Sequence, residues 1–597
     1  MIKWLGNRNI VADSALTQPM ANPELIEQHN RKQSFVFRSK MWMLILKRLA
    51  TNSFSATRRQ SRRNALNNAP VIAASHTELW NKHDNKHNWI LTAGKIENLR
   101  VAVQRINGLE IPSNTVFSFW KHIGNPNWGK GYVVGREIRE GCIIPTKAGG
   151  LCQLSNALYD AALNANFEIV ERHKHTKVVK GSLAEQNRDA TVKWNYIDLR
   201  FRSEYAFRIE ARLSGTELIV QFKSSGKATG ESDDSFVSQP VASINDCFSC
   251  GNTTCFKHPT GKEIEERTGI TAFLLDEAWP EFDTYISENA QKSDFFAVSV
   301  HNSRLIKSAK YRWKSGSNRP RPIKATNFAA LKRSIQLRLA AKRRQNPFQV
   351  ALKADNLLAR KLVQSVPVDC THIVISQNLL PTAWQSGILG GRTFDVLMTR
   401  LPMEILHQQL DEAHQQHPES ATLNDFRAPE ILVKKEQLAL NQARKIITPH
   451  RAIASVFTHK TILLDWKIPQ VKSVETPGTE ILFPASALGR KGAYAMKKLA
   501  QELDLSITVL GKATEREGFW ETVDIKSFRG LENVGLIVYP TTVEHQPRLL
   551  LKALAMDIPI ITTPAAGLPE SELVTIVPTN DYEALKEAFL AYQAEQK

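Results

Sequence analysis

Gly535-Leu536-Ile537-Val538-Tyr539-Pro540 is a short apolar run that ends at a proline, and runs like it recur from about residue 265 onward. The stretches between these runs have the spacing of amphipathic helices. This alternation is typical of an open parallel sheet flanked by helices. The candidate strands are 371–376, 445–448, 480–483, 506–511, 535–540 and 558–562. The sequence therefore predicts an α/β fold here, divided in two by a polar, proline-bearing stretch near 467–479, with a ligand where strand carboxyl ends meet.

Length and hydrophobicity set the class of protein. A chain of 597 residues exceeds what one core usually holds, so we expect three or so folded units. Its 42% hydrophobic content is ordinary for a soluble protein. The apolar run 41–46 is far shorter than the ~20 residues that a membrane-spanning helix needs. No charged-then-apolar leader opens the chain, so we expect a cytoplasmic location.

The formal charge of +19 is concentrated in two blocks, within the first seventy residues and over 307–344. Trp42, Met43 and Leu44 lie between basic flanks, as in a segment that lies on anionic lipid, where each basic residue contributes ~1 kcal/mol. This pattern predicts peripheral contact with the inner face of a membrane; the alternative is a solvated tail. Nucleic acid is not favoured as a partner, because no aromatic-interleaved RNA motif or helix-turn-helix pattern accompanies the charge.

The stretch Gly149-Gly150-Leu151-Cys152-Gln153-Leu154-Ser155 sets one thiol behind two glycines at the predicted start of a helix. Helix-terminal N–H groups and the macrodipole favour a thiolate there, which suggests a nucleophile. The chain order is Cys, His, Asp, as in a papain-like triad. The candidate bases are His175 and His173, and the candidate orienting carboxylates are Asp189 and Asp198. The alternative is a small buried cysteine beside a structural histidine.

This region resembles the VanW family over about residues 90–225. The shared segments are 112–119, 131–132, 149–155, 171–175, 189–192 and 198–201. Many members have Gly-Gly-Gly-x-Cys-Gln where this chain has Ala148-Gly149-Gly150-Leu151-Cys152-Gln153. The resemblance implies a link to the bacterial cell envelope and to glycopeptide-resistance clusters, and it brings no settled reaction with it.

A compact cysteine cluster follows, with the pattern C-x2-C-x4-C-x2-H. Its members are Cys247, Cys250, Cys255 and His258. Three thiolates and an imidazole can close a tetrahedral shell around zinc, and an iron–sulfur cluster is the alternative. A disulfide is disfavoured, because three cysteines cannot all pair and a cytoplasmic chain keeps them reduced. The cluster predicts a structural metal clip between two units.

The C-terminal part resembles the donor domain of retaining GT-B glycosyltransferases that use nucleotide sugars. The shared segments are 483–492, 543–555 and 558–567. The resemblance implies that Arg490, Lys491 and Gly492 hold a diphosphate at a helix start and that Glu544 binds donor-sugar or ribose hydroxyls. The family's second glutamate is replaced by Lys552, so a donor held differently, or a site that binds without turnover, is the alternative.

Together these features predict a mixed α+β VanW-like domain followed by two Rossmann-like domains of GT-B type. The expected function is transfer from a nucleotide sugar to an envelope glycan or lipid-linked acceptor. The alternatives are a hydrolase or acyl transferase with Cys152 as nucleophile, and a non-catalytic binding scaffold. The expected segments are a basic segment (1–70), a VanW-like domain (71–235), a metal-binding linker (236–264), an acceptor domain (265–465) and a donor domain (466–597).

Overall fold

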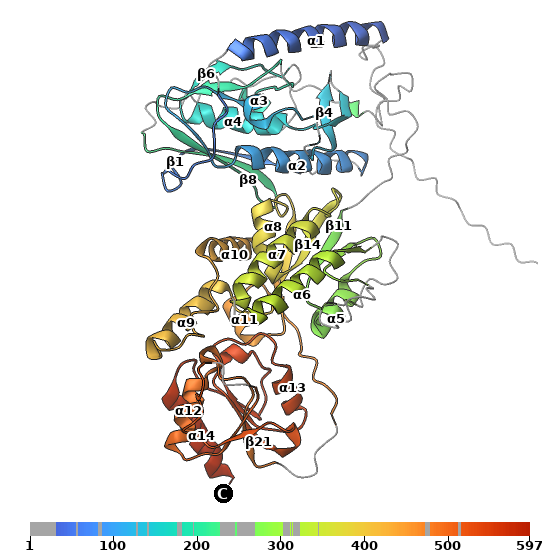
Figure 1. The fold of residues 1–597 in the computed structure, drawn as a ribbon. Helices are drawn as coiled ribbons and strands as arrows, with labels where there is room; N and C mark the ends of the chain where they lie inside the picture. Colours follow the sequence, from blue (N-terminus) through green and yellow to red (C-terminus); the bar gives the residue numbers. More distant parts are fainter. Residues whose placement is uncertain are drawn as a thin grey trace, which may run out of the picture. The chain divides into compact units, whose positions relative to one another are not determined.

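A computed structural model shows the fold in two compact units (Figure 1). The structure describes residues 31–54, 58–80, 86–126, 129, 131–139, 142–175, 182–194, 196–226, 245–246, 269–301, 311, 313, 323–343, 346–471, 478–511 and 515–596. Unit 1 comprises 1–77, 81–211 and 220–267, and unit 2 comprises 78–80, 212–219 and 268–597.

Unit 1 is a mixed α+β structure. Its largest sheet has the strand order β1-β9-β8-β2, and two three-stranded sheets have the orders β10-β5-β4 and β3-β7-β6. The strands are β1 (Val71–Glu78), β2 (Leu109–Ile111), β3 (Phe117–Ser118), β4 (Val134–Arg139), β5 (Cys142–Lys147), β6 (Glu168–Glu171), β7 (Arg200–Arg202), β8 (Phe207–Leu213), β9 (Glu217–Lys223) and β10 (Asn245–Asp246). The helices are α1 (Arg31–Phe54), α2 (Lys86–Ile106), α3 (Phe119–Ile123) and α4 (Cys152–Asn164). Buried aromatic rings hold the strands together, with Phe167 stacked on Phe222 at a centroid distance of 5.4 Å.

Helix α1 leaves large apolar side chains exposed. Phe35 is 72% exposed, Trp42 61% and Met43 64%. Arg48, near the end of the helix, forms an ion pair with Glu171 at the end of β6. Within the described ranges, no helix combines the length and the apolar character needed to cross a bilayer. The peripheral contact with a membrane stays a prediction.

The first sheet of unit 2 has seven parallel strands in the order β13-β12-β11-β14-β15-β16-β17. The chain therefore builds outward from β11 to one edge, returns, and builds outward again from β14. The strands are β11 (Ile270–Leu275), β12 (Phe295–Val298), β13 (Lys324–Ala325), β14 (Cys370–Ser376), β15 (Thr393–Leu397), β16 (Lys445–Thr448) and β17 (Thr461–Leu463). The helices are α5 (Pro280–Asn289), α6 (Asn327–Lys342), α7 (Pro347–Val363), α8 (Leu380–Ser386), α9 (Met403–Gln416), α10 (Glu430–Gln442) and α11 (Arg451–Val456).

The second sheet of unit 2 repeats this plan with six parallel strands in the order β20-β19-β18-β21-β22-β23. Numbered from its first strand, the order is 3-2-1-4-5-6, which is that of a dinucleotide-binding Rossmann sheet. The strands are β18 (Glu480–Phe483), β19 (Ile507–Val509), β20 (Ile525–Ser527), β21 (Val534–Tyr539), β22 (Ile560–Thr562) and β23 (Val574–Ile576). The helices are α12 (Ala493–Glu502), α13 (Arg548–Leu554) and α14 (Tyr582–Glu595).

The predicted fold class is confirmed. Each of the six candidate strands lies on an observed strand, and all of them belong to parallel sheets. Four residues of β21, Leu536 to Tyr539, are buried, as expected for a strand covered on both faces. Two Rossmann-like domains therefore follow the mixed domain, and the exact segment boundaries stay predictions.

Candidate functional site

A cavity of about 510 Å³ lies at the carboxyl ends of β18 and β21. These two strands are the point at which the strand order of the second sheet reverses, and ligands of open α/β sheets bind in the crevice there. The cavity is also walled by the preceding Rossmann-like domain of the same unit. Its lining residues are Ala413, Gln416, His417, Leu423, Gly489, Gly492, Tyr494, Ala495, Lys498, Pro540, Thr542, Pro578, Asn580, Asp581, Tyr582 and Glu583.

Gly492 shapes one wall of this cavity, because it is the N-cap of α12 with φ +83°. A Cβ atom at this position would lie 2.1 Å from the carbonyl oxygen of Pro540, so only glycine fits. The close approach brings the first turn of α12 against the loop after β21. The free N–H groups of a helix start attract anions, and Lys498 adds a cation one turn further along. This wall has the chemistry of a phosphate site.

Glu515 ties the facing domain to the glycine loop. Its carboxylate accepts hydrogen bonds from the hydroxyls of Ser420 and Thr422 in the preceding domain and, at 3.0 Å, from the amide of Gly489. The hydroxyl of Tyr494 donates to the same carboxylate at 3.2 Å. The carboxylate therefore links the preceding domain to the glycine loop and to the first turn of α12.

Lys491 and Glu544 form an ion pair with a distance of 2.8 Å between Nζ and Oε2. The Tyr539 hydroxyl donates to Oε2 at 2.7 Å, while the amides of His545 and Gln546 donate to Oε1 at 2.8 Å each. Burial alone would raise the pKa of Glu544, but Lys491 and these donors lower it to about 2. The carboxylate is therefore ionised and its acceptor sites are occupied within the protein.

Arg490 points toward the preceding domain. Its guanidinium donates to Asp425 at 2.7 Å and lies over the ring of Phe426, 5.5 Å from the centroid. Its carbonyl oxygen accepts hydrogen bonds from the amides of Thr542 and Val543, so the loops after β18 and β21 lie side by side. Lys552 is exposed on α13.

Of the predicted donor-site residues, all of which are described, Gly492 alone lines the cavity. Lys491 and Glu544 form an ion pair. Arg490 contacts the loop that carries Glu544 through its backbone carbonyl, and Lys552 is exposed on α13. Their roles stay predictions. The sequence analysis did not identify Lys498, Tyr494 and Asn580, which also line the cavity. The available sequence signal for Tyr494 and Lys498 was their position after the glycine loop. Asn580 had no such signal.

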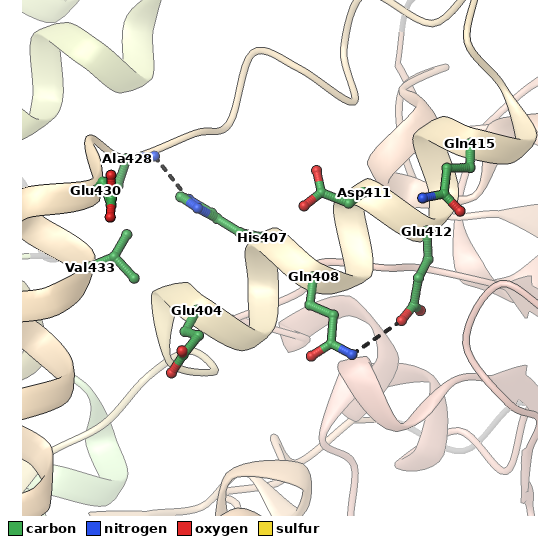
Figure 2. A pocket seen from close by; sticks show the side chains of 9 residues that line it. All are labelled: Glu404, His407, Gln408, Asp411, Glu412, Gln415, Ala428, Glu430 and Val433. Atoms are coloured by element: carbon green, nitrogen blue, oxygen red, sulfur yellow. Dashed lines mark hydrogen bonds between the residues drawn. The ribbon is translucent and has the colours of Figure 1, made fainter.

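A second hollow lies on α9 and the start of α10 (Figure 2) and has a volume of about 430 Å³. The His407 ring accepts a hydrogen bond from the Ala428 amide at 3.0 Å, as the dashed line in Figure 2 shows. Its carboxylates come from Glu404, Asp411, Glu412 and Glu430. Since four carboxylates repel a diphosphate, this hollow does not fit a nucleotide.

His450 is a fully buried imidazole where the two Rossmann-like domains meet. Its Nε2 lies 3.1 Å from the carbonyl oxygen of Ala565, and within the described residues its Nδ1 has no hydrogen-bond partner. A Cβ on Gly567 would collide with the ring at 2.3 Å, so the loop after β22 packs directly on it. Burial lowers the pKa of His450 to about 4 from 6.5, so the ring is neutral.

The depressed pKa of His450 predicts acid sensitivity. Between pH 4 and 6.5 the unfolded chain binds a proton on His450 that the folded chain does not, so the free energy of unfolding falls as the pH drops through this window. The expected loss is about 3 kcal/mol, and His450→Gln should remove it. Denaturant unfolding of the full chain across this range measures the slope, with exposed His459→Gln as the control. An unchanged slope in His450→Gln would contradict the assignment.

In unit 1, Cys152 is the first residue of α4, as predicted, and is partly exposed. Its thiol lies close enough to the imidazole of His175 to raise the pKa of that ring. Nδ1 of His175 lies 2.6 Å from Oδ2 of Asp189, and the His175 amide donates to the same oxygen at 2.7 Å. The structure therefore brings the three predicted residues of this site together, while their catalytic roles stay predictions.

The alternative base and carboxylate lie apart from this group. His173 is half exposed, and its ring faces Glu171 at 3.5 Å. Asp198 accepts hydrogen bonds from the hydroxyl of Ser118 at 2.6 Å and from the amide of Trp120 at 3.1 Å, at the start of α3. Asp198 therefore stabilises a helix terminus.

The predicted metal cluster of Cys247, Cys250, Cys255 and His258 lies outside the described residues. Among the residues whose positions are described, no group of three or more His, Cys, Asp and Glu side chains could hold a metal ion. Zinc and its iron–sulfur alternative stay predictions. Cys370, on β14, is buried.

Solved structures with a similar C-terminal region include the lipopolysaccharide outer core galactosyltransferase WaaB in its apo form, at 12% identity and a TM-score of 0.30. Another is a sucrose-phosphate synthase from Thermosynechococcus elongatus, at 14% identity and a TM-score of 0.31. Each match covers 55% of this chain and 90% of the other. Similarity this distant carries no argument about function.

The family model and the curated relatives match a limited part of the chain. Residues 94–223 match the family model described as VanW like protein. The chain is 32% identical over 130 residues to the uncharacterized protein YoaR of Bacillus subtilis, covering 21% of this chain and 42% of that protein. It is 31% identical over 147 residues to the vancomycin B-type resistance protein VanW of Enterococcus faecalis, covering 23% of this chain and 52% of that protein. Since the chain spans about half the length of these relatives at most, the similarity identifies a domain: residues 94–223 are a VanW-like domain.

Proposed function

We propose that unit 2 is a glycosyltransferase that uses a nucleotide-sugar donor. The observation that carries the proposal is the cavity of about 510 Å³ at the reversal point of the second sheet, walled by the preceding Rossmann-like domain. A transferase needs a donor site and an acceptor side that face each other, and two Rossmann-like domains in succession supply both. The donor diphosphate would lie at the start of α12, near Lys498.

The reaction follows from the charges at this wall. The acceptor hydroxyl oxygen forms a bond to the anomeric carbon, the bond from that carbon to the diphosphate oxygen breaks, and the acceptor proton passes to solvent or to the leaving phosphate. Charge grows on the diphosphate in the transition state, where the helix start and Lys498 stabilise it. The ionised Glu544 keeps Lys491 in place behind this loop.

The sequence resemblance to retaining GT-B glycosyltransferases and to the VanW family supports two further proposals, on stereochemistry and on the acceptor. We propose retention of configuration at the anomeric carbon and an acceptor that is an envelope glycan or a lipid-linked glycan. Proton NMR of the product formed from a labelled donor distinguishes retention from inversion.

The donor site is tested with two neighbouring lysines of α12. The full chain is titrated with uridine, guanosine and adenosine diphosphates by calorimetry. Nucleotide sugars are then screened as donors by measuring the release of the nucleoside diphosphate. Lys498→Ala should weaken nucleotide binding by about tenfold, because one charge-assisted contact is lost. Lys497→Ala is the matched control, since Lys497 lies over the ring of Phe519 and does not line the cavity.

Three outcomes are distinguishable. Binding that depends on Lys498, together with turnover, supports the transferase. Binding that depends on Lys498 without turnover of any donor, in the presence of envelope glycan extracts, supports a non-catalytic nucleotide-binding scaffold and overturns the transferase. Equal effects of the two lysine substitutions would show that the nucleotide does not use this cavity.

A further inference from the structure

We propose that unit 1 holds a second catalytic centre, in which the thiolate of Cys152 attacks a carboxylic amide or ester, His175 carries the proton and Asp189 orients the imidazole. The centre lies in the other unit from the donor cavity, and the proposal goes beyond the glycosyltransferase function. The three residues lie on three different segments: α4, the loop after β6 and the loop before β7.

The start of α4 sets the position of the thiol. Cys152 is the first residue of α4, a helix of 13 residues. The amides of the next three residues donate to the carbonyl oxygens of Gly150 and Leu151, so the backbone beside the thiol is a closed turn. The thiol lies 3.8 Å from the carbonyl oxygen of Val192 and also contacts His175. It is partly exposed, whereas Cys370, the other cysteine with a described side chain, is 2% exposed. Cys152 can therefore meet a substrate.

The glycines before Cys152 force the loop into place. Gly150 has φ +97°, and a Cβ there would lie 2.1 Å from the side chain of Lys95. A Cβ on Gly149 would lie 2.6 Å from the carbonyl oxygen of Gly135 in β4. The Gly149 carbonyl in turn accepts a hydrogen bond from the buried amide of Asn98 at 2.9 Å. The thiol is thus presented by a rigid turn clamped between α2 and β4.

Asp189 sets the orientation of the His175 imidazole. Oδ2 of Asp189 accepts from both the ring Nδ1 and the backbone amide of His175, so the carboxylate holds the ring by two bonds. With Nδ1 directed at Asp189, Nε2 is the nitrogen left to face the thiol. The His175 side chain is 25% exposed and that of Asp189 is 4% exposed. A buried carboxylate that orients a partly exposed imidazole is the arrangement that a general base needs.

Arg172 holds the carboxylate of Asp189 in place. Arg172 donates to Oδ1 of Asp189 at 2.9 Å and to its carbonyl oxygen at 2.8 Å. The same guanidinium lies over the ring of Tyr159 on α4, 4.8 Å from the centroid. The orienting residue is therefore braced from the helix that carries the nucleophile. We expect this support to hold Cys152, His175 and Asp189 in fixed positions relative to one another.

The charges are consistent with a proton carrier. Burial alone would lower the pKa of His175, but its hydrogen bonds to Asp189 and Cys152 raise the pKa to about 10. Its hydrogen bonds with His175 and the charge of Arg172 lower the pKa of Asp189, against the effect of its burial. An imidazolium beside the sulfur balances the charge of a thiolate, which is the nucleophilic form of cysteine.

The reaction balances with groups that are present and with water or an amine as the second substrate. The sulfur lone pair forms a C–S bond to the carbonyl carbon, and the bond to the amine or alcohol leaving group breaks as that group takes the proton from His175. Water or an amine then attacks the thioester, returns a proton to His175 and releases the thiolate. The product is a carboxylic acid in the first case and a new amide in the second.

The test uses the full chain and two small probes. Iodoacetamide at neutral pH, followed by peptide-resolved mass spectrometry, gives the alkylation rate of each cysteine. Cys152 should react at least about tenfold faster than Cys370, and His175→Gln should slow it by about tenfold. p-Nitrophenyl acetate should leave an acetyl group on Cys152 with a burst of p-nitrophenol, and the acetyl group should persist longer in His175→Gln.

Matched substitutions separate catalysis from structure. Cys152→Ser and Cys370→Ser both remove a thiol, but the first alone should abolish the burst. His173→Gln should leave the burst unchanged, because its ring faces Glu171. Asp189→Asn should shift the pH profile of alkylation, a change that a merely structural role would not produce. A Cys152 no more reactive than Cys370, or an unchanged burst in His175→Gln with unaltered thermal unfolding, would overturn the proposal. Neither result bears on nucleotide binding by unit 2.

Discussion

Gly492→Ala is expected to abolish nucleotide binding and to destabilise the second Rossmann-like domain by about 2–4 kcal/mol. The new methyl group would lie 2.1 Å from a backbone oxygen of Pro540, which cannot rotate away, and the residue would keep φ +83°. Relief requires that the start of α12 move away from the loop after β21, which opens the wall that we assign to the diphosphate. Calorimetric titration with nucleoside diphosphates and denaturant unfolding of the full chain measure both effects.

Gly518→Ala is the control for backbone strain. Gly518 also has positive φ, +69°, but its Cβ would meet the carboxylate end of Glu521, which can rotate aside. In this variant the free energy of unfolding should fall by about 1 kcal/mol, and nucleotide binding should be unchanged. If Gly492→Ala binds nucleotide as well as Gly518→Ala does, the start of α12 is not part of the donor site.

Arg333→Met is expected to lower the free energy of unfolding of the first Rossmann-like domain by about 3–5 kcal/mol, because it leaves a buried carboxylate without its cation. Arg333 donates to both oxygens of Asp276 at 2.7 Å and to Asp355 at 2.8 Å. The Arg333 side chain is 5% exposed and that of Asp276 is 1% exposed. Asp276 follows β11 and bonds Asn378 after β14, so the network joins the strands where the order of the first sheet reverses.

The matched control is Arg338→Met, which removes an exposed guanidinium from the same helix and should change stability little. Asp276→Asn combined with Arg333→Met should recover part of the loss, since the buried charge is then removed as well. Denaturant unfolding of the four proteins gives the comparison. Equal stability of the two arginine variants would show that the network does not hold the sheet.

The strands of unit 2 could be predicted because burial on both faces leaves a local signature. The run 480–483 matches β18 residue for residue, and 445–448 matches β16. The start of α4 at Cys152 was also predictable, since two glycines followed by apolar residues at helical spacing are a local pattern. The direction of the arginine at 490 was not predictable in this way. Its partner, Asp425, lies 65 positions earlier in the sequence.

In the two candidate sites, too, local sequence gave the candidate residues and tertiary contacts selected among them. The sequence offered two histidines and two aspartates for Cys152, and nothing in their spacing chose among them. The hydrogen bond between Asp189 and His175, and the bonds that hold Asp198 on Ser118 and Trp120 at the start of α3, made the choice. Lys498 was one basic residue among many until the close approach of Gly492 and Pro540 put it on a cavity wall.

By itself, the sequence determined the class of each half, the parallel strands and the helix that begins at Cys152, because apolar periodicity and glycine placement act over a few neighbouring residues. Only the tertiary structure decided which imidazole reaches the thiol, where Arg490 points and which lysine faces the cavity. Those outcomes depend on how loops distant in the chain close against one another, and loop closure is governed by packing and long-range hydrogen bonds that no local pattern encodes.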